Sequence, residues 1–133
     1  MFIDSNVFIY SLIDSRKQGQ DSRKFIKRIV SGEQKAVTSI AVIDETVFAI
    51  YSMKNYDLKL AEKTWKKLNE IPNLEILNLT KEVSSIVPIF IKQGLDPTDA
   101  VHAATMKINN IKIICSYDKH FDEIKEIKRQ EPR

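Results

Sequence analysis

The apolar positions along the chain form two kinds of pattern that alternate from the N-terminus onward. Short continuous apolar runs predict strands over residues 2–3, 35–39, 74–79 and 111–115. Between them lie longer runs in which apolar residues recur every three or four positions, the spacing of amphipathic helices. Strands that alternate with helices favour an α/β fold with a parallel sheet, in which ligands bind at the carboxyl ends of the strands.

Polar residues that cap helices mark where the first two helices begin. We expect Ser5 or Asn6 to cap a helix over the run VFIYSLI, because both side chains accept hydrogen bonds from free backbone amides. Asp21 or Ser22 is expected to begin the second helix, whose apolar and basic residues fall on opposite faces. These two helices connect the first predicted strand to the second.

Two further runs predict the central helices. Ser39 caps the stretch over residues 40–53, which is apolar nearly all round and therefore predicts a helix in the middle of the fold. An amphipathic helix over residues 57–71 would turn Trp65 inward. A later helix would be interrupted by Pro88, because proline removes a backbone hydrogen-bond donor.

The composition fits one globular domain over residues 1–133, with 43% hydrophobic and 29% charged residues. The formal net charge of +3 is compatible with a polyanionic partner and equally with an ordinary surface. The only cysteine, Cys115, lies in an apolar run and cannot form an intramolecular disulfide, which favours a reducing compartment. No apolar stretch reaches the length of a membrane span and no leader pattern opens the chain, so we expect a cytoplasmic protein without a membrane partner.

Four acidic residues follow an apolar segment or lie inside an apolar helix: Asp4, Glu45, Asp99 and Asp118. Each also has a purely structural explanation, as a turn or helix-capping carboxylate or as a charge at the edge of an apolar face. In a parallel sheet, however, all four can converge at the carboxyl edge, where a pair about 6 Å apart would repel by roughly 3 kcal/mol. A divalent cation would relieve this repulsion, and ligands that are all oxygen favour Mg²⁺ or Mn²⁺.

Four sequence stretches, in the same order, resemble the motifs of PIN-domain nucleases and, among these, the VapC-type toxins of toxin–antitoxin pairs. The stretches are FIDSNVFI, TSIAVIDE, LDPTDAVHAAT and IICSYDKHFDEI, so the resemblance covers almost the whole chain. It implies a single PIN domain with a three-layer α/β/α sandwich around a central, mainly parallel sheet of four to five strands.

The resemblance also implies which residues form the active site. The family's catalytic and metal-binding acids match four positions: Asp4, Glu45, Asp99 and Asp118. Its supporting polar positions match Asn6, Ser116 and, with a surface role as the alternative, Asp122. One or two Mg²⁺ or Mn²⁺ ions would bind the acids.

The implied function is that of a metal-dependent endoribonuclease. A water on the metal would lose its proton near neutral pH and attack the phosphodiester, so no covalent nucleophile would be needed.

The implied partners are RNA, an antitoxin protein and a second copy of the chain in a homodimer. The candidates for contacts with the RNA backbone are Arg16, Lys17, Lys54 and Lys119. The large side chains that favour a dimer are Tyr51, Met53, Tyr56 and Trp65.

Two residues and three competing functions remain open. His102, three residues after Asp99, is expected to be a packed, hydrogen-bonded residue rather than a ligand, and Tyr117 departs from the Asn common in relatives. A haloacid-dehalogenase-type phosphatase also begins with a strand ending in aspartate, but position 6 is Asn where that class has a second Asp. The sequence is also compatible with a housekeeping RNA-processing nuclease and with a non-catalytic module that binds RNA or a protein.

Overall fold

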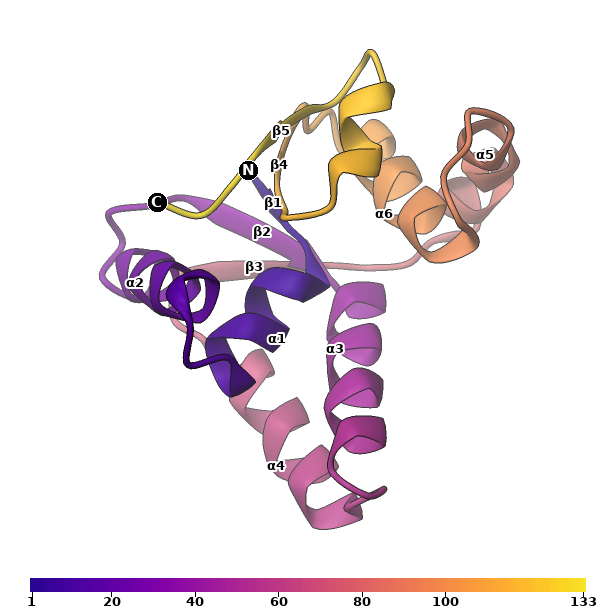
Figure 1. The fold of residues 1–133 in the computed structure, drawn as a ribbon. Helices are drawn as coiled ribbons and strands as arrows, with labels where there is room; N and C mark the ends of the chain where they lie inside the picture. Colours follow the sequence, from indigo (N-terminus) through magenta and orange to yellow (C-terminus); the bar gives the residue numbers. More distant parts are fainter.

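A five-stranded parallel sheet carries helices on both of its faces (Figure 1). The structure is a computed structural model that describes all residues from Met1 to Arg133. The strands are β1 (Phe2–Ile3), β2 (Ala36–Ser39), β3 (Leu74–Leu77), β4 (Ile113–Cys115) and β5 (Lys128–Gln130). The helices are α1 (Ser5–Ile13), α2 (Lys17–Val30), α3 (Ile40–Met53), α4 (Leu58–Asn69), α5 (Lys81–Lys92), α6 (Pro97–Ile108) and the 3-10 helix η1 (Lys119–Glu123). None of these helices is both long and apolar enough to span a bilayer.

The strand order in the sheet is β3-β2-β1-β4-β5, and every neighbouring pair is parallel. Right-handed crossovers put α1 to α4 on one face of the sheet and α5 and α6 on the other, and the two groups are separate in Figure 1. The predicted α/β sandwich with a parallel sheet of four to five strands is confirmed. The order of connection reverses between β1 and β4, so a ligand crevice is expected at their carboxyl ends.

Helix α1 begins at Ser5, which is earlier than a cap at Ser5 or Asn6 would place it. Asp4 is the N-cap of α1, and its Oδ1 accepts a hydrogen bond from Ser5 N at 2.7 Å. The backbone N of Asp4 donates to Cys115 O of β4 at 3.1 Å, which keeps this residue in the sheet as well. Asp4 is therefore fixed at the point where strand becomes helix.

Helix α2 begins at Lys17, before the predicted start around Asp21. The connection from α1 is tightened by Asp14, whose Oδ1 accepts a hydrogen bond from Arg16 N at 2.8 Å. Gly19 then lies directly against Asp14, and a Cβ at this glycine would lie 1.9 Å from the Asp14 carbonyl oxygen. The glycine thus permits a close approach between the two helices, although in sequence it counts against a helix.

Buried apolar side chains from both layers form one core around the sheet. Its largest fully buried members include Phe2, Phe8, Phe25 and Phe121. Two predictions about the helices are wrong. Trp65 is 37% exposed, because α4 turns Thr64 into the core in its place, while Leu68 is buried as predicted. Helix α5 runs through Pro88 without a break, since its packing against α6 offsets the lost backbone hydrogen bond.

Candidate metal centre

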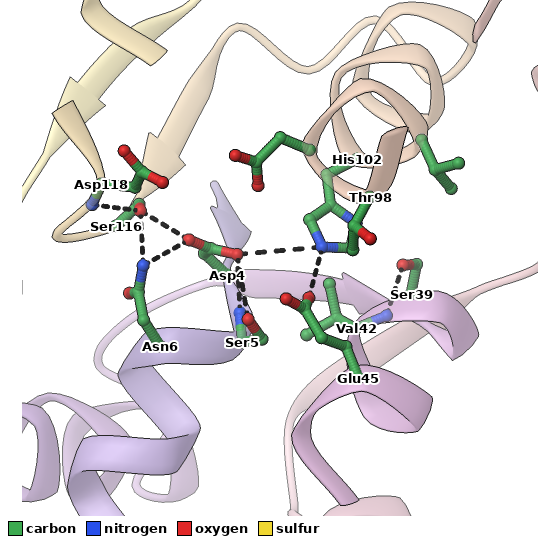
Figure 2. Close-up of polar contacts among 12 residues, drawn as sticks. Asp4, Ser5, Asn6, Ser39, Val42, Glu45, Thr98, His102, Ser116 and Asp118 are labelled. Atoms are coloured by element: carbon green, nitrogen blue, oxygen red, sulfur yellow. Dashed lines mark hydrogen bonds and ion pairs between the residues drawn. The ribbon is translucent and has the colours of Figure 1, made fainter. Parts of the chain in front are cut away.

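Asp4 lies at the centre of a network of buried hydrogen bonds at the carboxyl end of β1 (Figure 2). Its Oδ2 accepts hydrogen bonds from Asn6 Nδ2 at 2.6 Å and from Ser116 Oγ at 2.5 Å. Asp4 is 2% exposed, and burial raises the pKa of its carboxyl although the nearby His102 opposes the shift. The two polar residues predicted to support the first acid are therefore in direct contact with it.

The loop after β4, residues 116–118, is tied to the start of α1 by the same side chains. Ser116 Oγ accepts hydrogen bonds from Asn6 Nδ2 and from Asp118 N, both at 2.9 Å. Asn6 Oδ1 accepts a third hydrogen bond from Tyr117 N at 3.2 Å. Asp118 in turn caps η1, because its Oδ1 accepts a hydrogen bond from His120 N at 2.9 Å. The loop therefore has a fixed position relative to Asp4.

His102 joins α6 to α3 at the edge of the sheet. Its Nε2 lies 2.8 Å from Glu45 Oε2 and 3.9 Å from Asp4 Oδ1 (Figure 2). Burial lowers the pKa of this imidazole, but the hydrogen bond to Glu45 and the charge of Asp4 outweigh burial and raise the pKa overall. His102 Nδ1 is buried without a hydrogen-bond partner. The geometry agrees with the expectation of a packed, hydrogen-bonded residue, and it brings Glu45 to the site.

Asp99 contributes a buried carboxylate that has no partner. Asp96 caps α6 by accepting hydrogen bonds from Thr98 N at 2.9 Å and Asp99 N at 3.0 Å. The Asp99 side chain itself makes no hydrogen bond or ion pair, although the residue is only 8% exposed. Burial, followed by the charges of Asp4 and Asp96, raises the pKa of the Asp99 carboxyl to about 7. The helix dipole favours a carboxylate in this first turn of α6, and a bound cation would supply the partner that the chain does not.

Two groups of potential ligand atoms share Asp99. Atoms of Asp4, Asp99 and His102 lie within 4.8 Å of one another, and so do atoms of Asp99, Asp118 and His120. We call Asp4, Asp99 and Asp118 the acidic cluster. Its carboxylate oxygens fit Mg²⁺ or Mn²⁺, and a cation would offset the charge repulsion that contributes to the raised pKa of Asp99. The structure thus brings three of the four predicted acids together and connects the fourth, Glu45, through His102.

Asp122 lies outside both groups. Its carboxylate accepts hydrogen bonds from Arg129 Nε at 3.0 Å and Arg129 Nη2 at 3.1 Å. Arg129 Nη1 donates to Ser116 O at 2.9 Å, so Asp122 reaches the site only through this arginine. The position fits the alternative explanation of Asp122 as a surface residue better than a contact with a cation.

The four basic candidates for RNA contacts are placed differently. Arg16 and Lys17 each form an ion pair with a nearby aspartate. Lys54 follows the end of α3, about 20 Å along the helix axis from the sheet. Lys119 directly follows Asp118 and forms no ion pair, which leaves its charge available to a phosphate.

Tyr117 turns its side chain away from the acidic cluster. Its ring centroid lies 5.2 Å from that of Tyr10 in α1, and its hydroxyl donates a hydrogen bond to Gln18 O of α2 at 3.0 Å. The departure from the Asn of relatives therefore adds an anchor between the loop after β4 and the first two helices.

The sequence patterns did not single out His120 or Arg129. His120 Nδ1 lies 3.0 Å from Asp118 Oδ1, and the Asp-x-His spacing at a helix start is a signal that could have found it, because the cap turns the chain back toward the aspartate. Arg129 lies in the three-residue strand β5, which has no apolar pattern, so no local signal marks it.

Comparison with known proteins agrees with this fold. The family model described as PIN domain matches residues 1–127. The chain belongs to the PIN domain family. The resemblance inferred from the four sequence stretches is thereby confirmed, and the haloacid-dehalogenase alternative is set aside. This PIN domain matches none of the curated proteins with which it was compared.

Solved structures similar to this PIN domain include toxins and toxin–antitoxin complexes. VapC20 of Mycobacterium tuberculosis, a sarcin-ricin loop cleaving toxin, has a TM-score of 0.67 and 14% identity, with 89% of each chain covered. VapBC2 of Rickettsia felis, bound to a promoter DNA fragment, has a TM-score of 0.71 and 12% identity over 98% of this chain and 96% of that chain. A toxin–antitoxin complex from Klebsiella pneumoniae has a TM-score of 0.68 and 15% identity over 99% and 97%. At these identities the similarity establishes the fold.

Proposed function

We propose that this PIN domain is a metal-dependent endoribonuclease that hydrolyses RNA phosphodiester bonds and acts as the toxin of a toxin–antitoxin pair. The observation that carries the proposal is the Asp99 carboxylate, which is buried without a partner and belongs to both groups of potential ligands. A bound cation would supply the partner that this carboxylate lacks within the chain. The fold shared with VapC20, a sarcin-ricin loop cleaving toxin, supports RNA as the substrate.

The acidic cluster and Glu45 would hold Mg²⁺ or Mn²⁺. A divalent cation, when bound, lowers the pKa of a coordinated water and stabilises charge on the attacking and leaving oxygens of the phosphodiester. Asn6 and Ser116 keep the Asp4 carboxylate in one orientation through their hydrogen bonds to Oδ2. The proton shared between His102 Nε2 and Glu45 Oε2 keeps Glu45 turned toward the cluster. These contacts fix the acids before substrate arrives, which lowers the cost of reorganisation during the reaction.

A groove between α1, α2 and α4 supports an antitoxin partner. The groove has a volume of about 840 Å³. Its apolar floor includes Phe8, Leu12, Ile26 and Leu68. Its lining includes four lysines of α4, of which Lys66 is paired with Glu62, so that basic residues outnumber acidic ones there: Lys59, Lys63, Lys66 and Lys67. An amphipathic segment with acidic residues beside its apolar face complements this groove, and similarity to a toxin–antitoxin complex makes an antitoxin the favoured occupant.

Exposed apolar residues at the end of α3 support a homodimer. Phe48 is 64% exposed, and Met53, Tyr56 and Leu58 are exposed nearby. The ring of Tyr51 lies 6.3 Å from that of Phe48 and 5.2 Å from that of Tyr56, so the aromatic side chains form one patch. Large exposed apolar patches on a folded chain mark interfaces, and a second copy covers this one in the proposed dimer.

Cleavage of purified ribosomal and transfer RNA, with Mg²⁺, with Mn²⁺ or with EDTA, tests the proposed activity. Glu45→Gln should lower metal-dependent cleavage by at least about 100-fold, because the charge beside the cluster is lost. Asp44→Asn is the matched control, since it removes the neighbouring exposed acid of the same helix and should leave cleavage unchanged. Wild-type protein that cleaves neither RNA with either cation would contradict the proposal.

Expression in a bacterial host separates a toxin from a housekeeping RNA-processing nuclease. A toxin should arrest growth, and co-expression of a small protein encoded beside its gene should restore growth. Arrest should also disappear in the Glu45→Gln variant, which links it to the proposed site. Normal growth at high levels of active protein would favour the housekeeping alternative.

A further inference from the structure

We propose that His120 is a cation ligand beside Asp99 and Asp118, and that this side of the cluster therefore binds a first-row transition-metal dication such as Mn²⁺ in preference to Mg²⁺. The inference rests on the proposed metal-dependent function and specifies which class of cation that site takes. It concerns a residue outside the four predicted acids, and it assigns a binding role to an imidazole that the proposed function does not use.

The three side chains come from different parts of the chain and meet at one point. Asp99 lies in the first turn of α6, Asp118 caps η1, and His120 lies in η1. Ligand atoms of all three lie within 4.8 Å of one another, and His120 Nδ1 lies 3.0 Å from Asp118 Oδ1. Two ligands at right angles, each about 2.1 Å from one octahedral ion, are about 3 Å apart. The observed spacing of imidazole and carboxylate is therefore compatible with a shared cation.

The state of Asp99 is a second observation that points to a ligand. More than nine-tenths of this residue is buried, yet its carboxylate has no hydrogen bond and no ion pair. Asp118 accepts a hydrogen bond in capping η1, whereas the Asp99 carboxylate accepts none from the chain. A positive charge placed between Asp99 and His120 would supply the missing partner.

The side of the site at which His120 lies is the side that solvent can reach. The side chain of His120 is 72% exposed, whereas Asp4 and His102 on the other side are buried. A cation can therefore reach Asp99, Asp118 and His120 from solvent. The exposed position also means that removing the imidazole leaves the packed core unchanged.

Nitrogen as a ligand decides the preference between cations. Mg²⁺ favours oxygen ligands and retains its waters, so an imidazole adds little to its binding. Imidazole binds first-row transition metals, and affinity for a mixed nitrogen and oxygen site rises from Mn²⁺ to Ni²⁺. A site with two carboxylates and one imidazole therefore favours Mn²⁺ over Mg²⁺. Removal of the imidazole should weaken the binding of Ni²⁺ more than the binding of Mn²⁺.

Calorimetric titration of the full, tag-free chain with Mn²⁺, Ni²⁺ or Mg²⁺, in the absence of RNA, tests the proposal. His120→Ala should weaken Mn²⁺ binding by about 10-fold and Ni²⁺ binding by more, while Mg²⁺ binding should change by less than about 3-fold. Lys125→Ala is the matched control, because it removes an exposed lysine just after η1 that belongs to neither ligand group and should leave all three affinities within about 3-fold. Pulsed electron paramagnetic resonance of bound Mn²⁺ should show nitrogen coupling that is lost in His120→Ala.

Equal Mn²⁺ affinity in wild type and His120→Ala would overturn the proposal, as would a wild type that binds Mg²⁺ more tightly than Mn²⁺. Cleavage of RNA is measured separately on the same preparations. If His120→Ala binds Mn²⁺ as tightly as the wild type and RNA cleavage still depends on metal, the proposed nuclease function stands and this inference fails. Mn²⁺ binding that depends on His120, without any cleavage of RNA, would support the ligand assignment and contradict the nuclease.

Discussion

Asp4 combines two roles, the N-cap of α1 and membership of the acidic cluster, and one substitution separates them. Asparagine caps helices about as well as aspartate and keeps the shape of the side chain, but it carries no charge. Asp4→Asn should therefore stay folded, should melt at or above the wild-type temperature in EDTA because repulsion with Asp99 is relieved, and should lose RNA cleavage by at least about 100-fold. Thermal melting and a cleavage assay on one preparation measure both effects.

The control for Asp4 is a second capping aspartate. Asp96→Asn changes the N-cap of α6 in the same way, and Asp96 lies outside both ligand groups, so cleavage should be retained. If Asp4 were only a cap, Asp4→Asn would leave both stability and cleavage nearly unchanged, because asparagine caps about as well as aspartate. Retained cleavage would remove Asp4 from the site.

The raised pKa of Asp99 should make the stability of the metal-free protein depend on pH. The unfolded carboxyl titrates near its ordinary value of 3.8, and the folded one titrates at about 7. Between these values the folded state binds a proton that the unfolded state has released, so the contribution of Asp99 to stability is fully present below about pH 4 and is lost as pH rises to about 7. The expected loss from this group is about 2–4 kcal/mol.

Denaturant unfolding in EDTA between pH 4.5 and pH 8 measures this effect. Asp99→Asn should show a shallower fall in the free energy of unfolding and should be more stable than wild type near pH 8. Asp4 and His102 remain in both proteins, and the charge of Asp99 contributes to the raised pKa of His102, so the difference between the two curves reports Asp99 together with its effect on His102. Parallel curves would show that Asp99 is not the titrating group.

At the scale of elements, β5 positions the loop after β4 through Arg129. The guanidinium bridges Asp122 and the Ser116 carbonyl, which a lysine cannot do because it lacks the planar fork. Arg129→Lys should speed hydrogen exchange of the amides in residues 116–118 and lower cleavage by about 10-fold, with a loss of about 1 kcal/mol in overall stability. Lys128→Met alters the preceding exposed residue of the same strand and should change neither measurement.

How far each element could be predicted depends on how local its cause is. The helix over residues 40–53 was placed with its cap because an apolar run and Ser39 are adjacent in sequence. The start of α2 was missed because it depends on the close contact of Gly19 with Asp14, which only the folded connection reveals. Strand β5 has no apolar alternation, so pairing with β4 alone defines it.

The same distinction applies to the site. Asp4 and Asp118 could be predicted to converge because each follows a strand, and parallel strands end at one edge. The bond between Glu45 and His102 joins residues 57 positions apart on two different helices, and neither helix alone indicates which side chains meet. Arg129 acts through Asp122 and a backbone carbonyl, so its role follows from packing rather than from spacing.

At the scale of the whole molecule, cation binding should stabilise the fold. A ligand that binds only the native state adds about 2.7 kcal/mol at a concentration of 100 times its Kd, or a rise of roughly 8 °C in Tm for a chain of this size. Melting with millimolar Mn²⁺ should show this rise in wild type and a much smaller one in Asp99→Asn. An unchanged midpoint in wild type would count against a metal centre.

The proposed homodimer predicts how the whole chain behaves in solution. Phe48→Glu places a charge in the exposed aromatic patch of α3 and should convert a dimer into a monomer at tens of micromolar, as measured by light scattering. Ile89→Glu is the matched control, because it charges an exposed apolar residue of α5 on the other face of the sheet. A wild type with the mass of one chain would refute the dimer.

The contact between Ser116 and Asp4 spans 112 positions of the chain, and this separation governs when the site can exist during synthesis. A ribosome makes Asp4 first, but the hydroxyl that holds it and the strand that fixes that hydroxyl, through Ser116 N and Gln130 O, come from the last part of the sequence. Until β4 and β5 have emerged, the nascent chain can form α1 to α4 without an assembled cluster. The acidic cluster can therefore assemble only after residues 116–130 have been synthesised, and the proposed nuclease activity cannot begin before then.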